Sequence, residues 1–385
     1  MLLAKKIRLL PTKEQETLFR KSAGVARWSF NYFLAENERV YAETGKRAKE
    51  TEVRKYINNV LKKTTHIWLK EVGSNVMKQG VKDADLALRN YLSGKQGKPH
   101  FKSKKNSEPR FYVNYENLVK KPNGFHGEKI GFVKTSEPLP ELRKGDKYSN
   151  PRISFDGKYW YLSVGYEVKE STSQLTEESI GIDLGIKDLA ICSNGKTYKN
   201  INKSKEVRRL KKKLKREQRK LSRKLEADIA SYASNRKPIF DRPLTECKNF
   251  QKQKQKVKLI HRRLDGIRNN YLHQTTTEIV NNLPKQIVME TLNIQGMMKN
   301  KHLAEKIAEE KFYEFKRQIK YKSELRGITF IEAPIIYPSS KMCSCCGHIK
   351  KDLTLSDRVY ICPKCKTRID RDFNASLNLA NYKSA

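Results

Sequence analysis

The stretch IGIDLGIKDLAICSNGKTY, residues 180–198, decides the fold of the second half of this chain. Two apolar segments flank a short turn, and Asn194-Gly195 predicts a hairpin into a third strand. Downstream, QIVMETLN (286–293) and ITFIEAP (328–334) have the composition of short buried strands, and residues 304–327 have a helical pattern between them. We therefore predict an α/β fold built on a sheet of meandering and later-added strands.

Three acids lie where apolar chain would otherwise be expected. Asp183 is in the first strand, Glu290 ends a later strand, and Asp372 opens the helix-like tail RIDRDFNASLNLANY. The predicted order of elements is three meandering strands, then helices and further strands. This is the order of an RNase H-like domain, in which the strand ends bring distant acids together. Crowded carboxylates repel one another, so we expect two Mg²⁺ ions here, replaceable by Mn²⁺, that serve phosphodiester hydrolysis.

Two neighbouring acids compete for these roles. Asp370 is as close to the tail helix as Asp372, and the residues alone leave that choice open. Asp188 falls where the first strand turns into the second, so we interpret it as a turn residue. The order and spacing of all three acids together make this a nuclease prediction.

The charge balance predicts a polyanionic partner. The 385 residues include 81 Lys and Arg against 42 Asp and Glu, a formal net charge of +39, and such a surplus favours nucleic acid. No apolar run approaches the roughly 18 residues of a spanning helix, so no membrane is expected. MLLAKKIRLLPTKEQE does not have the pattern of a signal peptide, which predicts a prokaryotic cytoplasmic protein.

The most basic tract, residues 203–224, predicts a phosphate-binding helix. An apolar seam at three- and four-residue spacing runs through it and is matched by Val257, Ile260, Leu264, Ile267 and Tyr271, which indicates an antiparallel helical hairpin over 203–273. Residues 226–250 between the helices read as irregular. The basic loop 93–109 is a second cationic segment. The nucleic-acid contacts expected from both are Arg208, Arg209, Lys211, Lys212, Lys213, Lys215, Arg216, Arg219 and Lys102.

The first half of the chain predicts helices inserted into a sheet. Residues 1–10 alternate as a strand, and Thr12 with Gln15 forms a capping box that starts helical periodicity up to about Leu92. Its apolar stripes are Phe30, Phe33, Leu34 and Tyr41, and Met77, Val81, Ala84, Leu88 and Tyr91. Residues 153–168 alternate as strands around a tight turn at Asp156-Gly157, and we expect the first strand to join them. The polar segment 171–179 predicts a linker at a domain boundary.

Five of the seven cysteines lie close together. Cys343-x-x-Cys346 and Cys362-x-x-Cys365 are separated by 15 residues, a spacing that offers four thiolates to one structural zinc ion. Cys345 lies inside the first pair and is not expected to be a ligand, while His348 is an alternative. A closed four-sulfur site has no free coordination position, so this zinc would stiffen a small module beside Asp372.

These motifs resemble the TnpB family, transposon-encoded RNA-guided DNA endonucleases related to type V CRISPR effectors. The resemblance runs over nearly the whole chain and is most specific in GIDLGIKDLA, VMETLNIQGMMKN and PSSKMCSCCG…CPKC…DRDFNASLNLA. It implies that Asp183, Glu290 and Asp372 are the acids of a RuvC-type nuclease site, because the catalytic acid precedes x-N-A. It also implies a guide RNA and a double-stranded DNA target chosen by base pairing and a short flanking motif.

The resemblance implies a multidomain α/β layout. A β-barrel-like wedge domain would comprise residues 1–11 and 97–172, and a helical recognition domain residues 12–96. The RuvC or RNase H-like domain would comprise 173–336 and 368–385, with a zinc ribbon that binds target nucleic acid inserted at 337–367. No protein partner is implied, and a monomer is expected.

Three alternatives stay open on the sequence. Segment 226–250 is longer and less basic than the family connection we expect, which leaves open a CRISPR-type guide instead of a transposon-derived RNA. A non-cleaving RNA-guided repressor is a second alternative, although this chain keeps all three acids. A transposase that joins DNA ends is the third, since the same metal site can use a 3′-hydroxyl.

Overall fold

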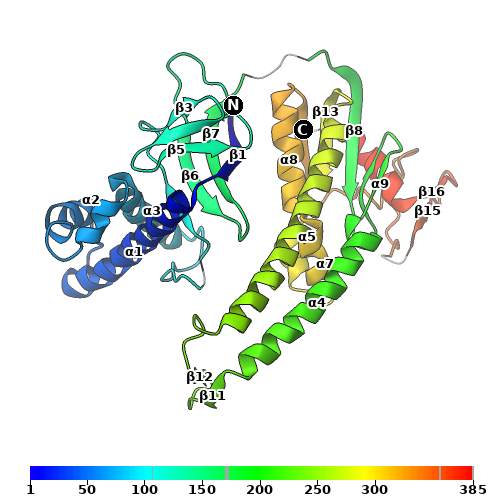
Figure 1. Ribbon diagram of the computed structural model, residues 1–385. Helices are drawn as coiled ribbons and strands as arrows, with labels where there is room; N and C mark the ends of the chain where they lie inside the picture. Colours follow the sequence, from blue (N-terminus) through cyan, green and yellow to red (C-terminus); the bar gives the residue numbers. More distant parts are fainter. Residues whose placement is uncertain (106, 170–172, 355–356, 384–385) are drawn as a thin grey trace. The chain divides into compact units, whose positions relative to one another are not determined.

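The computed structural model describes residues 1–105, 107–169, 173–354 and 357–383. The chain divides into two compact units, Met1–Val168 and Lys169–Ala385, which are treated separately below (Figure 1). No helix in these described ranges combines the length and apolar character needed to cross a bilayer.

The helices of the first unit begin as predicted. Helix α1 (Lys13–Thr44) starts at a capping box in which Thr12 accepts from Gln15 N and the Gln15 side chain accepts from Thr12 N. Helices α2 (Glu50–Tyr56) and α3 (Ser74–Leu92) follow, joined by a π-helix, η1 (Ile57–Leu61), and a 3₁₀-helix, η2 (Ile67–Glu71). Both predicted stripes are buried except at their C-terminal aromatics, because Tyr41 is 62% exposed and Tyr91 39%.

A seven-stranded antiparallel sheet completes the first unit. Its order is β2-β6-β7-β1-β5-β4-β3, and β1 (Leu2–Leu10) pairs with β7 and β5, which confirms that the first strand joins the later ones. The outer strands β2 and β3 do not pair with each other among the described residues, so the barrel predicted for this region is not closed. The remaining bounds are β2 (Arg110–Tyr112), β3 (Val119–Lys121), β4 (Gly124–Gly127), β5 (Gly131–Thr135), β6 (Ser149–Phe155) and β7 (Trp160–Glu167).

The turn between β6 and β7 forms where the sequence predicts it. The Asp156 carboxylate accepts from the backbone N–H groups of Lys158 and Tyr159, and Gly157 has a φ of 98°. Beyond the turn, Trp160, Leu162 and Val164 alternate into the core.

A five-stranded mixed sheet is the centre of the second unit. Strands β8 (Thr176–Leu184), β9 (Asp188–Cys192) and β10 (Thr197–Lys199) form the predicted antiparallel meander. Strands β13 (Pro284–Glu290) and β14 (Thr329–Ala333) add in parallel on the other side of β8, so the order is β10-β9-β8-β13-β14.

The two faces of this sheet have different coverings. Ile180, Ile182 and Met289 point to the face packed by α5 (Lys248–Val280) and α8 (Phe312–Leu325). The opposite face, which includes Val288, is packed by α9 (Arg371–Ala380). Because side chains alternate along a strand, Gly181 and Asp183 lie on the α9 face as well.

The basic tract forms the predicted helical hairpin. Helix α4 (Lys205–Glu226) and α5 pack through Val207, Leu210, Ile260 and Leu264, with β11 (Ile229–Tyr232) and β12 (Pro238–Phe240) at their far end (Figure 1). The prediction of an irregular 226–250 was therefore wrong for these two short strands. A 3₁₀-helix, η3 (Ile201–Lys203), precedes α4.

Two further predictions need correction. The single helix expected over 304–327 is broken at Lys311, whose φ of 54° separates α7 (Ala304–Glu310) from α8. The linker expected at 171–179 is shorter, because β8 already begins at Thr176, while residues 171 and 172 lie outside the described residues. Short elements complete the unit: α6 (Ile294–Met298), β15 (Val359–Ile361) and β16 (Arg368–Asp370).

Candidate metal centre and nucleic-acid interface

The structure brings the three predicted acids to one cleft. Strand β13 runs parallel to β8 with Met289 opposite Ile182, so Glu290 at the end of β13 lies beside Asp183. Asp372 lies in the first turn of α9, which packs on β8. All three line a cleft of about 730 Å³.

Gly181 allows α9 to approach the sheet this closely. A Cβ at this position would collide with Ser376 O and Ala380 N of α9. Any larger residue would push the helix off β8 and move Asp372 away from Asp183. Gly181 lies in the apolar stretch 180–198, but strand periodicity does not show that a helix packs on it.

The carboxylates repel one another. Burial, together with the charges of Glu290 and Asp372, raises the pKa of Asp183 well above its usual range, and a hydrogen bond joins Asp183 to Glu290. Burial and the Asp372 charge also raise the pKa of Glu290. The protein therefore concentrates negative charge where solvent compensates it poorly, which is the condition that a divalent cation relieves.

The competition between Asp370 and Asp372 has a structural basis. The Asp370 carboxylate accepts from Asp372 N and Phe373 N, both at 3.0 Å, and so serves as the N-cap of α9. Asp372 instead faces the cleft, where Arg371 donates to its Oδ1 at 3.0 and 3.1 Å. Asp188 is not a turn residue as interpreted, because it begins β9 and pairs with Lys199 at 3.3 Å.

Cationic side chains share the cleft with the acids. Lys187, Lys341, Arg358 and Arg371 line it beside the three predicted acids and Asp188. The sequence analysis did not identify these four residues; for Arg371, its position next to Asp372 was the available signal. A polyanion that enters the cleft would therefore meet both the acids and nearby positive charge.

The four predicted zinc ligands converge. The sulfurs of Cys343, Cys346, Cys362 and Cys365 all lie within 4.8 Å of one another, which is compatible with one zinc site. Among the described residues this is the only cluster of metal-binding side chains packed so tightly, so the three acids are spaced more widely than the four thiols. Cys345 is exposed and is not part of the cluster.

Two buried asparagines connect this cluster to the acid cleft. Asn374 Nδ2 donates to Met342 O at 2.7 Å, and its Oδ1 accepts from Ser344 N at 2.9 Å. Asn378 Nδ2 donates to Ser339 O and Met342 O. Both asparagines belong to α9, so the first cysteine pair is fixed to the helix that carries Asp372. Their functional value was missed because a buried Asn resembles an ordinary helix residue in sequence.

Most of the predicted phosphate contacts on α4 are exposed. Arg208, Arg209, Lys212, Lys213, Lys215, Arg216 and Arg219 all lie on its solvent side. Lys211 is different: its amine pairs with Glu309 at 2.7 Å and Glu305 at 3.2 Å. This lysine attaches α4 to α7 and is not a free phosphate contact in this structure.

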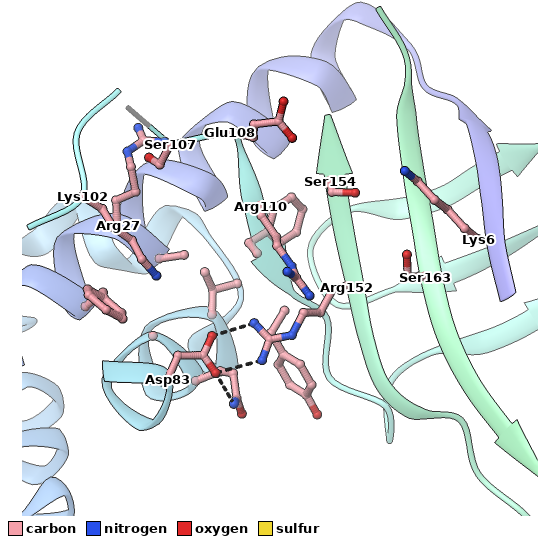
Figure 2. Close-up of a pocket in the computed structure, with 17 residues that line it drawn as sticks. Lys6, Arg27, Asp83, Lys102, Ser107, Glu108, Arg110, Arg152, Ser154 and Ser163 are labelled. Atoms are coloured by element: carbon pink, nitrogen blue, oxygen red, sulfur yellow. Dashed lines mark hydrogen bonds and ion pairs between the residues drawn. The ribbon is translucent and has the colours of Figure 1, made fainter. Parts of the chain in front are cut away.

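Lys102 belongs to a cationic cavity in the first unit. Figure 2 shows Lys6, Arg27, Lys102, Arg110 and Arg152 around a cavity of about 510 Å³. Arg152 is held by the Asp83 carboxylate in two hydrogen bonds of 2.6 and 2.8 Å.

The cations of this cavity are crowded. Burial lowers the pKa of Arg27, and burial together with Arg152 lowers the pKa values of Lys102 and Arg110. The Asp83 carboxylate raises the pKa values of Lys102 and Arg110, but the net shift of both is still downward. The cavity therefore has the electrostatics of an anion site.

Three family models match the chain in order. A "Helix-turn-helix domain" model matches residues 1–46, a "Probable transposase" model residues 163–301 and a "Cas12f1-like, TNB domain" model residues 312–379. In residues 1–46 the structure has one strand and one long helix, so the first model's title does not describe the local fold.

Curated relatives align over nearly the full length. "Putative RNA-guided DNA endonuclease InsQ" of Escherichia coli K12 is 27% identical over 97% of this chain and 90% of its own. A "Putative RNA-guided DNA endonuclease" of Streptomyces pristinaespiralis is also 27% identical, over 97% and 87%. "TnpB-like protein L770" of Acanthamoeba polyphaga mimivirus is 25% identical over 98% and 72%.

A solved structure has the same fold. The chain titled as the cryo-EM structure of a Cas12f1–sgRNA–target DNA complex aligns over 99% of both chains with a TM-score of 0.57 at 14% identity. This likeness shows the fold alone. The family models and the full-length relatives, which are named as RNA-guided DNA endonucleases or TnpB-like proteins, confirm the resemblance to the TnpB family that the sequence motifs indicate.

Proposed function

We propose that this protein is an RNA-guided endonuclease that cleaves DNA at the cleft formed by Asp183, Glu290 and Asp372. The observation that carries the proposal is the meeting of these acids, far apart in sequence, on one face of the mixed sheet. The relatives named as RNA-guided DNA endonucleases support the same reading.

The donor set fits two divalent cations. Three carboxylates supply hard oxygen ligands, and the raised pKa values of Asp183 and Glu290 reflect burial and mutual repulsion, which bound cations would relieve. Bound Mg²⁺ would activate water and stabilise the leaving oxygen of a phosphodiester. Asp183, Glu290 and Asp372 would hold the ions, and Arg371 would orient Asp372 through its two hydrogen bonds.

The chain's other residues would bind and orient the substrate. Lys187, Lys341 and Arg358 line the cleft, where they can contact phosphates on either side of the cut. The exposed side of α4 would follow a nucleic-acid backbone. The cationic cavity of Figure 2 would bind a further phosphate group.

The domain roles belong to the same proposal. The strand order β10-β9-β8-β13-β14 supports an RNase H-like, RuvC-type core in the second unit. We assign the wedge role to the seven-stranded sheet and the recognition role to helices α1–α3. A short DNA motif beside the target would be read by the protein, while guide pairing selects the target.

A structural zinc ion completes the proposal. Cys343, Cys346, Cys362 and Cys365 would hold it, and the asparagines of α9 would couple it to the cleft. Elemental analysis should find one zinc per chain in the wild type and none in Cys362→Ser. Cys345→Ser is the matched control and should keep its zinc; equal zinc contents in both variants would contradict the assignment.

The decisive experiment uses the RNA that co-purifies with the protein. Its sequence should contain a constant part and a variable guide, and replacing the guide should redirect Mg²⁺-dependent cutting to the matching DNA. Binding to the new target without strand scission would favour the repressor alternative. Cutting that ignores the guide would refute the proposal.

A further inference from the structure

An aromatic cluster lies on the helical part of the first unit and shares no residue with the cavity of Figure 2. The Trp28 ring stacks on Tyr32, with centroids 5.1 Å apart and an interplanar angle of 29°. His66 lies 4.9 Å from Trp28, and Trp68 meets it edge-on at 5.5 Å. Trp28 and Tyr32 of α1, which also pack against the core, thus form one aromatic surface with His66, just before η2, and Trp68 within it.

This surface reaches solvent. Trp68 is 40% exposed, and the neighbouring Ile67, Tyr56 and Val60 are 57%, 49% and 40% exposed. Large apolar side chains concentrated in one short segment mark an interaction surface more often than an incomplete core. By contrast Trp160, the remaining tryptophan of the three in the chain, is 1% exposed.

The backbone beneath the cluster is unusual and well anchored. The π-helix Ile57–Leu61 precedes η2, and π-helical turns are rare and often occur at functional sites. His66 N donates to Leu61 O at 2.7 Å, while Ile57 and Leu69 are buried on either side. The segment therefore presents Trp68 from a fixed base.

Positive charge gathers beside the same segment. Lys129 Nζ donates to Lys70 O, which places the Lys129 amine beside η2. Burial and the amines of Lys129, Lys78 and Lys70 lower the pKa of Lys62, although Glu128 opposes this shift. Three further amines within electrostatic reach of Lys62 favour a polyanionic occupant over an apolar protein surface. An aromatic surface beside lysines is the arrangement with which proteins stack bases and hold the linked phosphates.

We propose that Trp28, His66 and Trp68 form a stacking site for an unpaired nucleobase, with the adjoining phosphates held by Lys62 and its neighbouring lysines. The site concerns binding only, so it does not depend on cleavage at the carboxylates. The alternative occupants, a second copy of this chain or another protein, are outcomes of the test.

The test measures binding of a short oligothymidylate and of an abasic oligonucleotide with the same number of phosphates. The full-length protein, freed of nucleic acid at high salt, is titrated in EDTA, and intrinsic tryptophan fluorescence is recorded with affinity. The buried Trp160 should contribute little to the change. The wild type should be quenched and should bind the base-containing strand about tenfold more tightly than the abasic one.

Two substitutions isolate the ring. Trp68→Leu keeps an apolar side chain without a π-face and should abolish the preference for bases, while Trp68→Phe should retain most of it. Tyr313→Ala removes another exposed aromatic, in the second unit, and should leave the preference unchanged. Circular dichroism checks that each variant is folded.

Two results would overturn the proposal. One is equal wild-type affinity for both strands; the other is a base preference that survives in Trp68→Leu. If the strands cause no quenching but dilution changes the sedimentation of the wild type and not of Trp68→Leu, the occupant is a second copy. Since the assay contains no divalent metal, failure here leaves the proposed cleavage function untouched.

Discussion

The carboxylate cleft of the second unit and the cationic cavity of the first are electrostatic opposites. In the cleft, burial and like charge raise the pKa values of Asp183 and Glu290. In the cavity, burial and like charge lower the pKa values of Lys102 and Arg110. In both sites the charged form of these side chains is destabilised. A ligand of the opposite charge would stabilise it, so we expect the cleft to favour cations and the cavity to favour anions.

The charges of the buried acids in the cleft and of the cations in the cavity are compensated only in part by neighbouring side chains. Asp83 forms its ion pair with Arg152 and offsets the crowding of Lys102 and Arg110 only in part. Arg371 pairs with Asp372 and lowers the pKa of Asp183 without reversing its rise. A structural ion-pair network would match its charges more completely, as the Arg39 pairs with Glu36 and Glu43 do on α1.

The largest effect is expected from the cleft. Asp183→Asn should lower Mg²⁺-dependent cleavage by at least about 10²–10³-fold, because one of the charges that hold the cations is lost. In EDTA the same variant should melt at a higher temperature than the wild type, because the repulsion at Glu290 is reduced. Cleavage assays and differential scanning calorimetry measure the two effects.

Asp370→Asn is the matched control. Asparagine also caps helices well, so α9 should be retained and cleavage should stay near the wild-type level. If Asp370→Asn lost cleavage while Asp183→Asn kept it, the assignment of the cleft would be wrong.

The exposed side of α4 provides the next effect. Replacing Lys212, Lys213 and Lys215 by Gln should lower the slope of log affinity against log salt by about 2–3, since each phosphate contact contributes roughly 0.9. Fluorescence anisotropy with duplex DNA at several salt concentrations measures it. Lys211→Gln should change the slope little, because Glu305 and Glu309 already neutralise that amine. A similar fall in the slope for both variants would show that Lys211 contacts phosphate in spite of its ion pairs.

Gly181 tests how the cleft is assembled. Gly181→Ala should destabilise the protein by about 1–3 kcal/mol, because the added Cβ meets the backbone of α9. Urea denaturation measures this loss, and cleavage should fall with it. Gly266→Ala, in the open interior of α5, should instead stabilise by about 0.5–1 kcal/mol. Equal effects at the two glycines would contradict the close approach of α9 to β8.

Arg110 is the counterpart test in the cavity. Arg110→Gln should weaken binding and reduce the salt slope by about one, as expected for a single phosphate contact. The free protein should be no less stable, because a crowded cation has been removed. Arg39→Gln, which removes a paired surface arginine of the same unit, should leave affinity unchanged. If Arg110→Gln lowered the stability of the protein but left its affinity for nucleic acid unchanged, Arg110 would have a structural role and not a binding role.

The smallest effect is expected at Glu310, a carboxyl group whose pKa is raised mainly by burial and not by a cluster of like charges. Burial raises the pKa of Glu310 to about 7, although Asn200 and Asn202 donate hydrogen bonds to it. In the unfolded chain this group titrates near 4.5, so stability should fall as pH rises from 4.5 to about 7 and then stay level. Glu310→Gln should remove that slope in pH-dependent denaturation; an unchanged slope would assign it to other groups.

The sequence predicted elements better than contacts. The meander at 180–198, the capping box at Thr12 and the helical hairpin all formed because each depends on local periodicity or turn chemistry. The break at Lys311 was missed, since a left-handed lysine leaves no mark in a helical pattern. The exposure of Tyr41 and Tyr91 was missed because periodicity does not show where a packing partner ends.

The candidate site was predicted to a similar extent. The acids could be chosen because charged residues stand out in buried strands, and the cysteines because their spacing is specific. The role of Gly181 depends on α9 meeting β8, a contact between segments almost 200 residues apart. The roles of Asn374 and Asn378 depend on contacts with the backbone carbonyls of Met342 and Ser339, which helical periodicity does not show. Lys211 could not be separated from its neighbours because its acidic partners lie on another helix.

The position of α9 on β8 also sets an order in time. Asp372 follows Asp183 by 189 residues (372 − 183), and both the strand partner β13 and the helix α9 come late. At roughly 5–20 residues per second, a ribosome needs on the order of 10–40 s to make that stretch. Once Glu226 has been added, the growing chain carries the whole basic helix α4 but has no complete set of acids. A newly made molecule can therefore engage nucleic acid well before it is able to cut it.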